Sequence, residues 1–347
     1  MALVQEIASM KIRSFISGCG GLQLSAAEAA FFHEQNPWGL ILFKRNCETP
    51  AQQKTLTTAF RQAVGRKDAP VFIDQEGGRV QRLGPPSNYW RKYPQARAYG
   101  DLYAKNPLAA LRAARHVGRL MAEDLIEAGI TANCLPVLDV PQAGSHDVIG
   151  NRAYSLNIEH VMALARAHTA GFMDGGVLPV MKHIPGHGRS EVDSHHNLPV
   201  VNASRTELEQ IDFPPFAAFA DSPMAMTAHV IYTAIDKTAP ATLSRKVVKS
   251  VIREAIGFRG LLMTDDLSMK ALSGTLAEKC DKALNAGCDM LLHCSGIMDE
   301  MHEVASAADE LKGKALRRAR AALKSVRKPQ VFDRKAAIKD WELVVSA

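Results

Sequence analysis

One polar segment of the chain concentrates residue types that transfer protons. It runs from Lys182 to Pro199 and contains four histidines and two glycines. Asp193 stands two residues before His195, and a carboxylate at that spacing can orient an imidazole and stabilise its charged form. Such a pair can donate and later accept a proton near neutral pH. We therefore expect Asp193 and His195 to act as an acid/base pair.

A pair of aspartates follows a different apolar run. Asp265 and Asp266 come directly after residues 260–264, so the first falls at the tip of an expected strand and the second points elsewhere. A retaining glycosidase uses such a carboxylate as its nucleophile, opposite a proton donor. We expect this role for Asp265, while Asp266 or Ser268 caps the next helix.

Short apolar runs alternate with helical patterns along the chain. Strands are expected at residues 14–17, 39–43, 70–74, 132–138, 178–183, 224–229, 260–264 and 289–293. Each run is nearly continuously apolar, which is typical of parallel strands covered on both faces. Eight strand–helix units predict an α/β fold, a single (β/α)8 TIM barrel with slightly irregular strands. A doubly wound open sheet is the alternative.

The helical patterns occupy the segments between these strands. They are expected at residues 26–33, 52–64, 108–128, 159–173, 204–219, 244–256, 275–286 and 299–327. Gly129 stands where a helix C-terminal cap would fall, and Ser204 with Glu207 forms a capping box. Residues 77–105 are expected to form an irregular insertion. We expect a single domain over residues 1–347, with residues 329–347 as a C-terminal tail packed on it.

Barrel active sites lie at the C-terminal ends of the strands, and polar groups gather at those ends here. The candidates are Asp74, Arg82, Arg152, Lys182 and His183. Carboxylates and forked guanidinium groups can bind neighbouring hydroxyls in pairs, so this set suits a polyhydroxylated ligand. A structural ion pair is the alternative for Asp74 and Arg82, and Glu76 and Arg79 are expected to be scaffolding.

Composition narrows the function classes. The chain has 347 residues and a net charge of +6, with its basic residues scattered except between Lys312 and Lys328. It lacks aromatic–basic interleaving, so we expect no nucleic-acid partner. The N-terminus has an early acid and no apolar core, and no run is long enough for a membrane span, so neither a signal peptide nor a membrane partner is expected. Six scattered cysteines without a C-x-x-C pair indicate reduced thiols in a cytoplasmic protein.

The motifs together resemble glycoside hydrolase family 3, and within it the NagZ-type β-N-acetylglucosaminidases. The segments that carry the resemblance are Lys-His-Ile-Pro-Gly-His-Gly at 182–188 with Asp-Ser-His at 193–195, and residues 74–82, 136–140, 149–152 and 264–269. They span about residues 10–300 in the family's order. Residue 184 is Ile instead of the more frequent Phe, residue 75 is Gln, and Ala153-Tyr154 replaces Ser-Phe; none of these removes a catalytic group.

The resemblance implies a retaining β-N-acetylhexosaminidase that uses neither a metal nor a cofactor. Asp265 would be the nucleophile, His195 the acid/base and Asp193 its partner. The residues that would hold N-acetylglucosamine are Asp74, Arg82, Arg152, Lys182 and His183. The implied substrates are small carbohydrates, the muropeptides of peptidoglycan recycling, in which N-acetylglucosamine is β-linked to 1,6-anhydro-N-acetylmuramic acid. A monomeric enzyme is expected.

Three alternatives remain open at this point. A phosphorylase of the same family would pass the sugar to phosphate, because a histidine repels phosphate less than a carboxylate does. A non-catalytic sugar-binding barrel would keep the fold without turnover. A metal-dependent hydrolase would use the loop histidines, but their spacing matches no known zinc pattern and the loop is rich in glycine.

Overall fold

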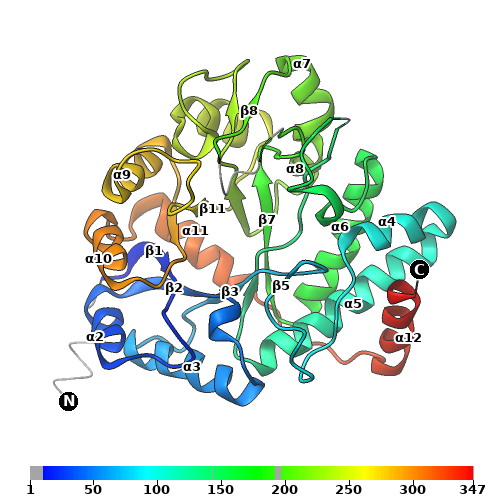
Figure 1. Ribbon diagram of the computed structural model, residues 1–347, viewed down its shortest axis with the longest axis horizontal. Helices are drawn as coiled ribbons and strands as arrows, with labels where there is room; N and C mark the ends of the chain where they lie inside the picture. Colours follow the sequence, from blue (N-terminus) through cyan, green and yellow to red (C-terminus); the bar gives the residue numbers. More distant parts are fainter. Residues whose placement is uncertain (1–10, 143, 191, 193–196, 347) are drawn as a thin grey trace.

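The computed structural model describes residues 11–142, 144–190, 192 and 197–346. Within these residues eight parallel strands close into a barrel, with helices around the outside (Figure 1). In chain order the barrel strands are β1 (Arg13–Ser17), β2 (Pro37–Leu42), β3 (Val71–Ile73), β6 (Ala132–Asn133), β7 (Leu178–Ile184), β9 (Met224–Thr227), β11 (Leu261–Asp266) and β12 (Met290–His293). The predicted (β/α)8 TIM barrel is confirmed.

Apolar side chains cover both faces of the barrel strands. On β3, Phe72 belongs to the cluster inside the barrel with Ile41 of β2, whereas Val71 and Ile73 belong to the larger cluster between strands and helices. Side chains alternate across a strand, so a strand buried on both faces needs an unbroken apolar run. This requirement explains why every expected strand corresponds to an observed one.

The helices that surround the barrel are α2 (Ala26–Gln35), α3 (Pro50–Ala63), α4 (Ala96–Lys105), α5 (Pro107–Glu127), α6 (Ile158–Asp174), α7 (Arg205–Glu207), α8 (Phe213–Ala218), α9 (Leu276–Ala286), α10 (Met298–Ala307), α11 (Gly313–Lys324) and α12 (Arg334–Val345). Two π-helical segments, Leu208–Asp212 and Val247–Ala255, complete the outer layer. The predicted cap at Gly129 is confirmed by its φ of +79°, and the Ser204–Glu207 capping box is present. Among the described residues, no helix is long and apolar enough to cross a membrane.

The structure corrects the prediction of one helix over residues 299–327. Two helices, α10 and α11, occupy this range, because the segment between them pairs with β1. The Ser14 N–H donates to the Asp309 carbonyl, and the Leu311 N–H donates to the Ile12 carbonyl. A helix cannot continue through residues whose backbone groups bond to a strand.

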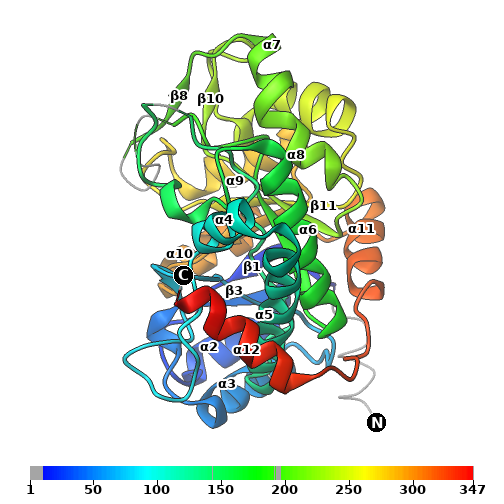
Figure 2. The ribbon, with the colours of Figure 1, turned by 90° about the vertical axis from the view of Figure 1, so that its right-hand side faces the viewer.

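Two further segments contain helices or strands that were not predicted. The insertion at 77–105 is not wholly irregular, since it holds α4 and β5 (Val80–Gln81), which pairs with β4 (Gln75–Gly77). The C-terminal segment contains α12, which lies along α5 (Figure 2). Asp340 of α12 is 5% exposed and receives hydrogen bonds from Arg112 and pairs with His116 of α5.

The fourth barrel strand is shorter than the predicted 132–138. β6 ends at Asn133, and beyond it the Leu135 N–H turns back and donates to the Asn133 carbonyl at 2.8 Å. Backbone hydrogen bonds to β7 continue beyond it: the Val180 N–H donates to the Leu135 carbonyl at 3.0 Å, and the Leu138 N–H donates to the Lys182 carbonyl at 2.8 Å. The backbone after β6 therefore still supports the end of β7.

Two glycines let α5 and α6 approach closely. A Cβ built on Gly171 of α6 would lie 2.1 Å from the Arg115 carbonyl oxygen, and one on Gly118 of α5 would lie 2.5 Å from the His168 carbonyl oxygen. Both obstacles are backbone, which cannot rotate away. Because α6 leads directly into β7, this contact fixes the helix that precedes the strand carrying Lys182 and His183.

Replacement of Gly171 by Ala is expected to lower the free energy of unfolding by about 2 kcal/mol, because the added methyl group must push α5 and α6 apart. Urea unfolding followed by circular dichroism measures this change. Gly21→Ala is the matched control: its Cβ would meet no atom within 4 Å, so its unfolding free energy should match that of the unchanged protein. Equal stability of the two variants would contradict the close contact.

Candidate active site

A cavity of about 300 Å³ opens at the C-terminal ends of the barrel strands. Its lining includes six of the predicted site residues: Asp74, Arg82, Arg152, Lys182, His183 and Asp265. They come from three strand ends and two loops far apart in the sequence. The other two predicted residues, Asp193 and His195, lie outside the residues that the structure describes.

Lys182 forms the centre of the cavity's charge network. Its Nζ lies 2.8 Å from Asp74 Oδ1 and 2.7 Å from Glu76 Oε1, although its side chain is only 3% exposed. Burial alone would lower the pKa of Lys182, but the two carboxylates outweigh burial and raise it. The ammonium group is therefore charged at neutral pH and remains fixed at the end of β7.

Asp74 connects this lysine to a second cation. Its Oδ2 accepts a hydrogen bond from Arg82 Nη2 at 3.0 Å, while its Oδ1 accepts from Lys182. Burial raises the pKa of Asp74, yet Lys182 and Arg82 together hold it well below its usual value. The result is a fixed carboxylate between two donors, a group that can receive the hydrogen bond of a ligand hydroxyl.

Glu76 joins Lys182 to Arg152. The Arg152 guanidinium donates from Nε and Nη2 to the two Glu76 oxygens, each at 2.8 Å, in a bidentate pair. Despite burial, which raises the pKa of Glu76, Arg152 and Lys182 lower it to about 2. This pair fixes the Arg152 side chain, which belongs to a short 3-10 turn (Gly150–Arg152), at the wall of the cavity.

Asp139 holds the beginning of the loop that follows β7. Its Oδ2 pairs with His183 Nδ1 at 2.7 Å, and its Oδ1 accepts the His187 N–H at 2.7 Å. The carboxylate fixes the ring orientation of His183 and leaves Nε2 for a ligand. The His187 ring packs edge-on against His183, and burial together with that neighbour lowers the His187 pKa to about 4.

Asp265 stands at the end of β11 and faces the same cavity. Burial raises its pKa, but the positive potential of His229, His183 and Lys182 and a 2.8 Å hydrogen bond from the Asp266 N–H lower it. The carboxyl group is therefore ionised at neutral pH. An ionised carboxylate beside a sugar-sized cavity has the charge that a glycosidase nucleophile requires.

Asp266 has a different role from the predicted helix cap. Its carboxylate accepts from Ser268 N at 3.0 Å, Ser268 Oγ at 2.6 Å and Cys294 N at 3.2 Å, which connects the end of β11 to the segment after β12. No helix begins there; α9 starts at Leu276 with Thr275 as its cap. His229 Nε2 lies 2.9 Å from the Asp266 carbonyl oxygen and supports the same turn.

Three supporting residues received no binding or catalytic role from the sequence: Glu76, Asp139 and His229. Each follows or ends a barrel strand, and that position was the signal that they lie near the site. Their partners could not be read from the sequence, because Arg152 is 76 residues from Glu76 and His183 is 44 residues from Asp139. Arg79 is scaffolding as expected, since it donates to the Val148 carbonyl at 2.8 Å.

Glycines shape the described beginning of the loop after β7. Gly186 has a φ of +134°, and a Cβ on Gly188 would lie 2.1 Å from the Val140 carbonyl oxygen. The Tyr232 hydroxyl donates to the Gly186 carbonyl. Within the described part of the chain, no group of three or more His, Cys, Asp or Glu side chains is arranged to hold a metal ion.

Comparison with known proteins identifies the family to which the chain is similar. The sequence model of the glycosyl hydrolase family 3 N terminal domain matches residues 3–327. A beta-hexosaminidase of Alkalilimnicola ehrlichii is 38% identical over 290 residues, which cover 82% of each chain. One of Neisseria meningitidis is 39% identical over 272 residues, or 76% of this chain and 74% of that one.

Solved structures of β-N-acetylglucosaminidases and related enzymes are also similar to this chain. NagZ from Neisseria gonorrhoeae in complex with N-trifluoroacetyl-D-glucosamine superposes with a TM-score of 0.87 and 31% identity, covering 96% of this chain and 98% of that one. A β-N-acetylglucosaminidase of this family from Paenibacillus has a TM-score of 0.82 and 28% identity, covering 99% of this chain and 68% of that one.

The buried Glu76 supplies a stability prediction. Glu76→Gln should lower the unfolding free energy by about 3 kcal/mol at pH 6, because it leaves Lys182 and Arg152 with one carboxylate fewer. The Glu76 pKa is depressed in the folded state, so the stabilisation exists above the unfolded value, about 4.3, and disappears as the pH falls toward about 2. Urea unfolding of both proteins between pH 6 and pH 3 should show the difference shrinking. A difference that stays constant over this range would contradict an ionised Glu76.

Proposed function

The chain belongs to glycosyl hydrolase family 3, and we propose that this glycoside hydrolase is a retaining exo-β-N-acetylglucosaminidase. The observation that carries the proposal is the position of Asp265, which shares one cavity with Asp74, Arg82 and Lys182. The proposed nucleophile and the charged side chains that would bind sugar hydroxyls therefore line the same cavity, whose volume suits one sugar. The names of the beta-hexosaminidase relatives support this reading.

In the first step, an Asp265 oxygen attacks the anomeric carbon of the bound sugar. A covalent glycosyl–enzyme bond forms as the glycosidic carbon–oxygen bond breaks, and His195 donates its proton to the leaving oxygen. Asp193 orients the imidazole and stabilises its charged form. In the second step, water attacks the same carbon, His195 accepts the proton of that water, and Asp265 is released as a carboxylate.

The charge network around Lys182 is proposed to bind the sugar. Asp74 accepts from ligand hydroxyls, and Arg82, Arg152, Lys182 and His183 donate to them. A volume of about 300 Å³ lies at the small end of ligand pockets and suits one monosaccharide unit, which supports exo cleavage at a chain end. Hydroxyl groups held between fixed charges would keep the anomeric carbon close to Asp265.

The proposal also names a specific substrate. We propose N-acetylglucosamine β-linked to 1,6-anhydro-N-acetylmuramic acid, as found in the muropeptides of peptidoglycan recycling in the cytoplasm. The structure of NagZ with N-trifluoroacetyl-D-glucosamine supports an N-acylated glucosamine as the sugar. We also propose that the enzyme is a monomer.

Loss of the nucleophile should abolish turnover. Asp265→Ala is expected to lower kcat for an aryl β-N-acetylglucosaminide by about 10⁴-fold or more, because no covalent intermediate can form. Release of the aryl alcohol measures the rate. Asp265→Asn, which can still accept from the Asp266 N–H, controls for local disruption and should be equally inactive. Full activity in either variant would refute the assignment, and dependence of the unchanged enzyme on added phosphate would favour a phosphorylase.

The effect of removing the proton donor on the rate should depend on the leaving group. His195→Ala is expected to reduce kcat/KM by about 10²- to 10⁴-fold for substrates whose leaving alcohol needs a proton. The reduction should be far smaller for a 2,4-dinitrophenyl glycoside, whose leaving group departs unprotonated. Steady-state kinetics over a series of aryl glycosides measures this. The same reduction for every leaving group would exclude His195 as the proton donor.

A further inference from the structure

A second cavity lies at the opposite end of the barrel from the active site. Its volume is about 660 Å³, and its wall includes Pro179, Pro223 and Gly260, which lie at the starts of β7, β9 and β11. Helices α6 and α11 form its sides. Figure 2 shows α11 at one end of the barrel and the β8 (Val200–Val201) and β10 (Ile231–Tyr232) pair at the other. Five arginines line the cavity: Arg166, Arg259, Arg317, Arg318 and Arg327.

Nearby carboxylates offset only part of this charge. Arg318 pairs with Asp289 at 2.7 Å, and Arg327 lies 3.3 Å from Asp174. Asp221, a lining residue, is 4.0 Å from Arg166. These carboxylates compensate three of the five arginines at most, because Asp289 and Asp174 each pair with a further arginine outside the cavity.

Two of the arginines have no ion-pair partner in the described part of the chain. Arg259 and Arg317 come from the loop before β11 and from α11, and their side chains make no hydrogen bond to described residues. Both arginines are exposed, and the cavity carries about two positive charges without a carboxylate partner among the described residues. Guanidinium groups in such a position bind phosphate and carboxylate oxygens through paired N–H donors.

Buried hydroxyl groups in the same wall also lack partners. Thr169 and Ser222 are 9% and 7% exposed, and the hydroxyl oxygen of each has no hydrogen-bond partner among the described residues. Both residues line the cavity. Their oxygens are enclosed by protein atoms, however, so the arginines are the groups that a ligand in the cavity would contact.

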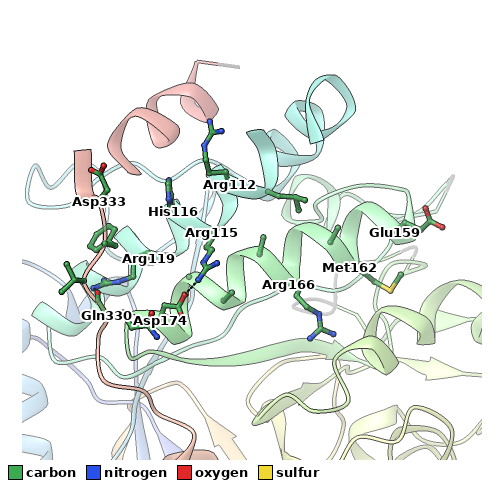
Figure 3. A pocket seen from close by; sticks show the side chains of 17 residues that line it. Arg112, Arg115, His116, Arg119, Glu159, Met162, Arg166, Asp174, Gln330 and Asp333 are labelled. Atoms are coloured by element: carbon green, nitrogen blue, oxygen red, sulfur yellow. Dashed lines mark hydrogen bonds and ion pairs between the residues drawn. The ribbon is translucent and has the colours of Figure 1, made fainter. Parts of the chain in front are cut away.

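A neighbouring groove shows what structural arginines look like in this protein. It lies between α5, α6 and residues 330–333, where Arg115 donates to Asp174 (Figure 3) and Arg112 donates to Asp340. In Figure 3, Arg166 extends from α6 away from these arginines, and it also lines the second cavity. The groove's α5 arginines thus serve to hold α5, α6 and α12 together.

We propose that the cavity at the N-terminal end of the barrel binds a small metabolite that carries a phosphate monoester. Such a group has a charge of about −1.5 to −2 at neutral pH, which matches the uncompensated charge of the cavity. The volume lies within the range of small-molecule pockets, so a sugar-sized body fits beside the phosphate. This site is independent of the proposed glycosidase activity.

Isothermal titration of the full chain with fructose 6-phosphate tests the proposal, with fructose as the uncharged control. Fructose 6-phosphate should bind and fructose should not. The double variant Arg259→Gln/Arg317→Gln should weaken binding at least tenfold, because it removes both unpaired guanidinium groups. Arg320→Gln is the matched control on the same helix, since Arg320 does not line the cavity; its affinity should stay within twofold of the unchanged protein.

Three results would overturn the proposal. They are the absence of fructose 6-phosphate binding, equal weakening by Arg320→Gln and by the double variant, and tighter binding of a short DNA duplex to the same arginines. The last result would assign the surface to nucleic acid instead.

Discussion

The buried ammonium group of Lys182 is the constraint on which the site depends. A cation that is almost inaccessible to water requires compensating carboxylates, and Asp74 and Glu76 provide them from the segment after β3. Those carboxylates in turn fix Arg82 and Arg152. One buried charge therefore joins strand ends and loops that are up to 108 residues apart in the sequence into a single wall.

The barrel itself could be predicted because burial of its strands and capping of its helices leave local patterns in the sequence. Strands buried on both faces need continuous apolar runs, and capped helices show their ends through residues such as Gly129 and Ser204. The break between α10 and α11 could not be predicted in this way. It depends on backbone hydrogen bonds between residues 309–311 and the start of β1, and such long-range partners leave no local pattern.

Prediction of the candidate site from the sequence was limited in the same way, because long-range partners leave no local pattern. The strand-end position identified Asp74, Lys182 and Asp265, which the structure brings to one cavity. It did not reveal that Glu76 joins Lys182 to Arg152, since a glutamate in a surface turn and one in a buried network look alike in sequence. The arginines of the second cavity come from four separate segments and were equally hidden, apart from the basic stretch near the C-terminus.

The two ends of the barrel thus present different electrostatic designs. At the C-terminal end every cation of the proposed sugar site has a carboxylate or lies beside one, and the ionised Asp265 remains for chemistry.

The direct test of this assignment is to incubate the enzyme with a fluorinated N-acetylglucosaminyl fluoride and map the labelled peptide by mass spectrometry. We predict one sugar attached to Asp265; a label on another residue, or turnover without any covalent intermediate, would contradict the account.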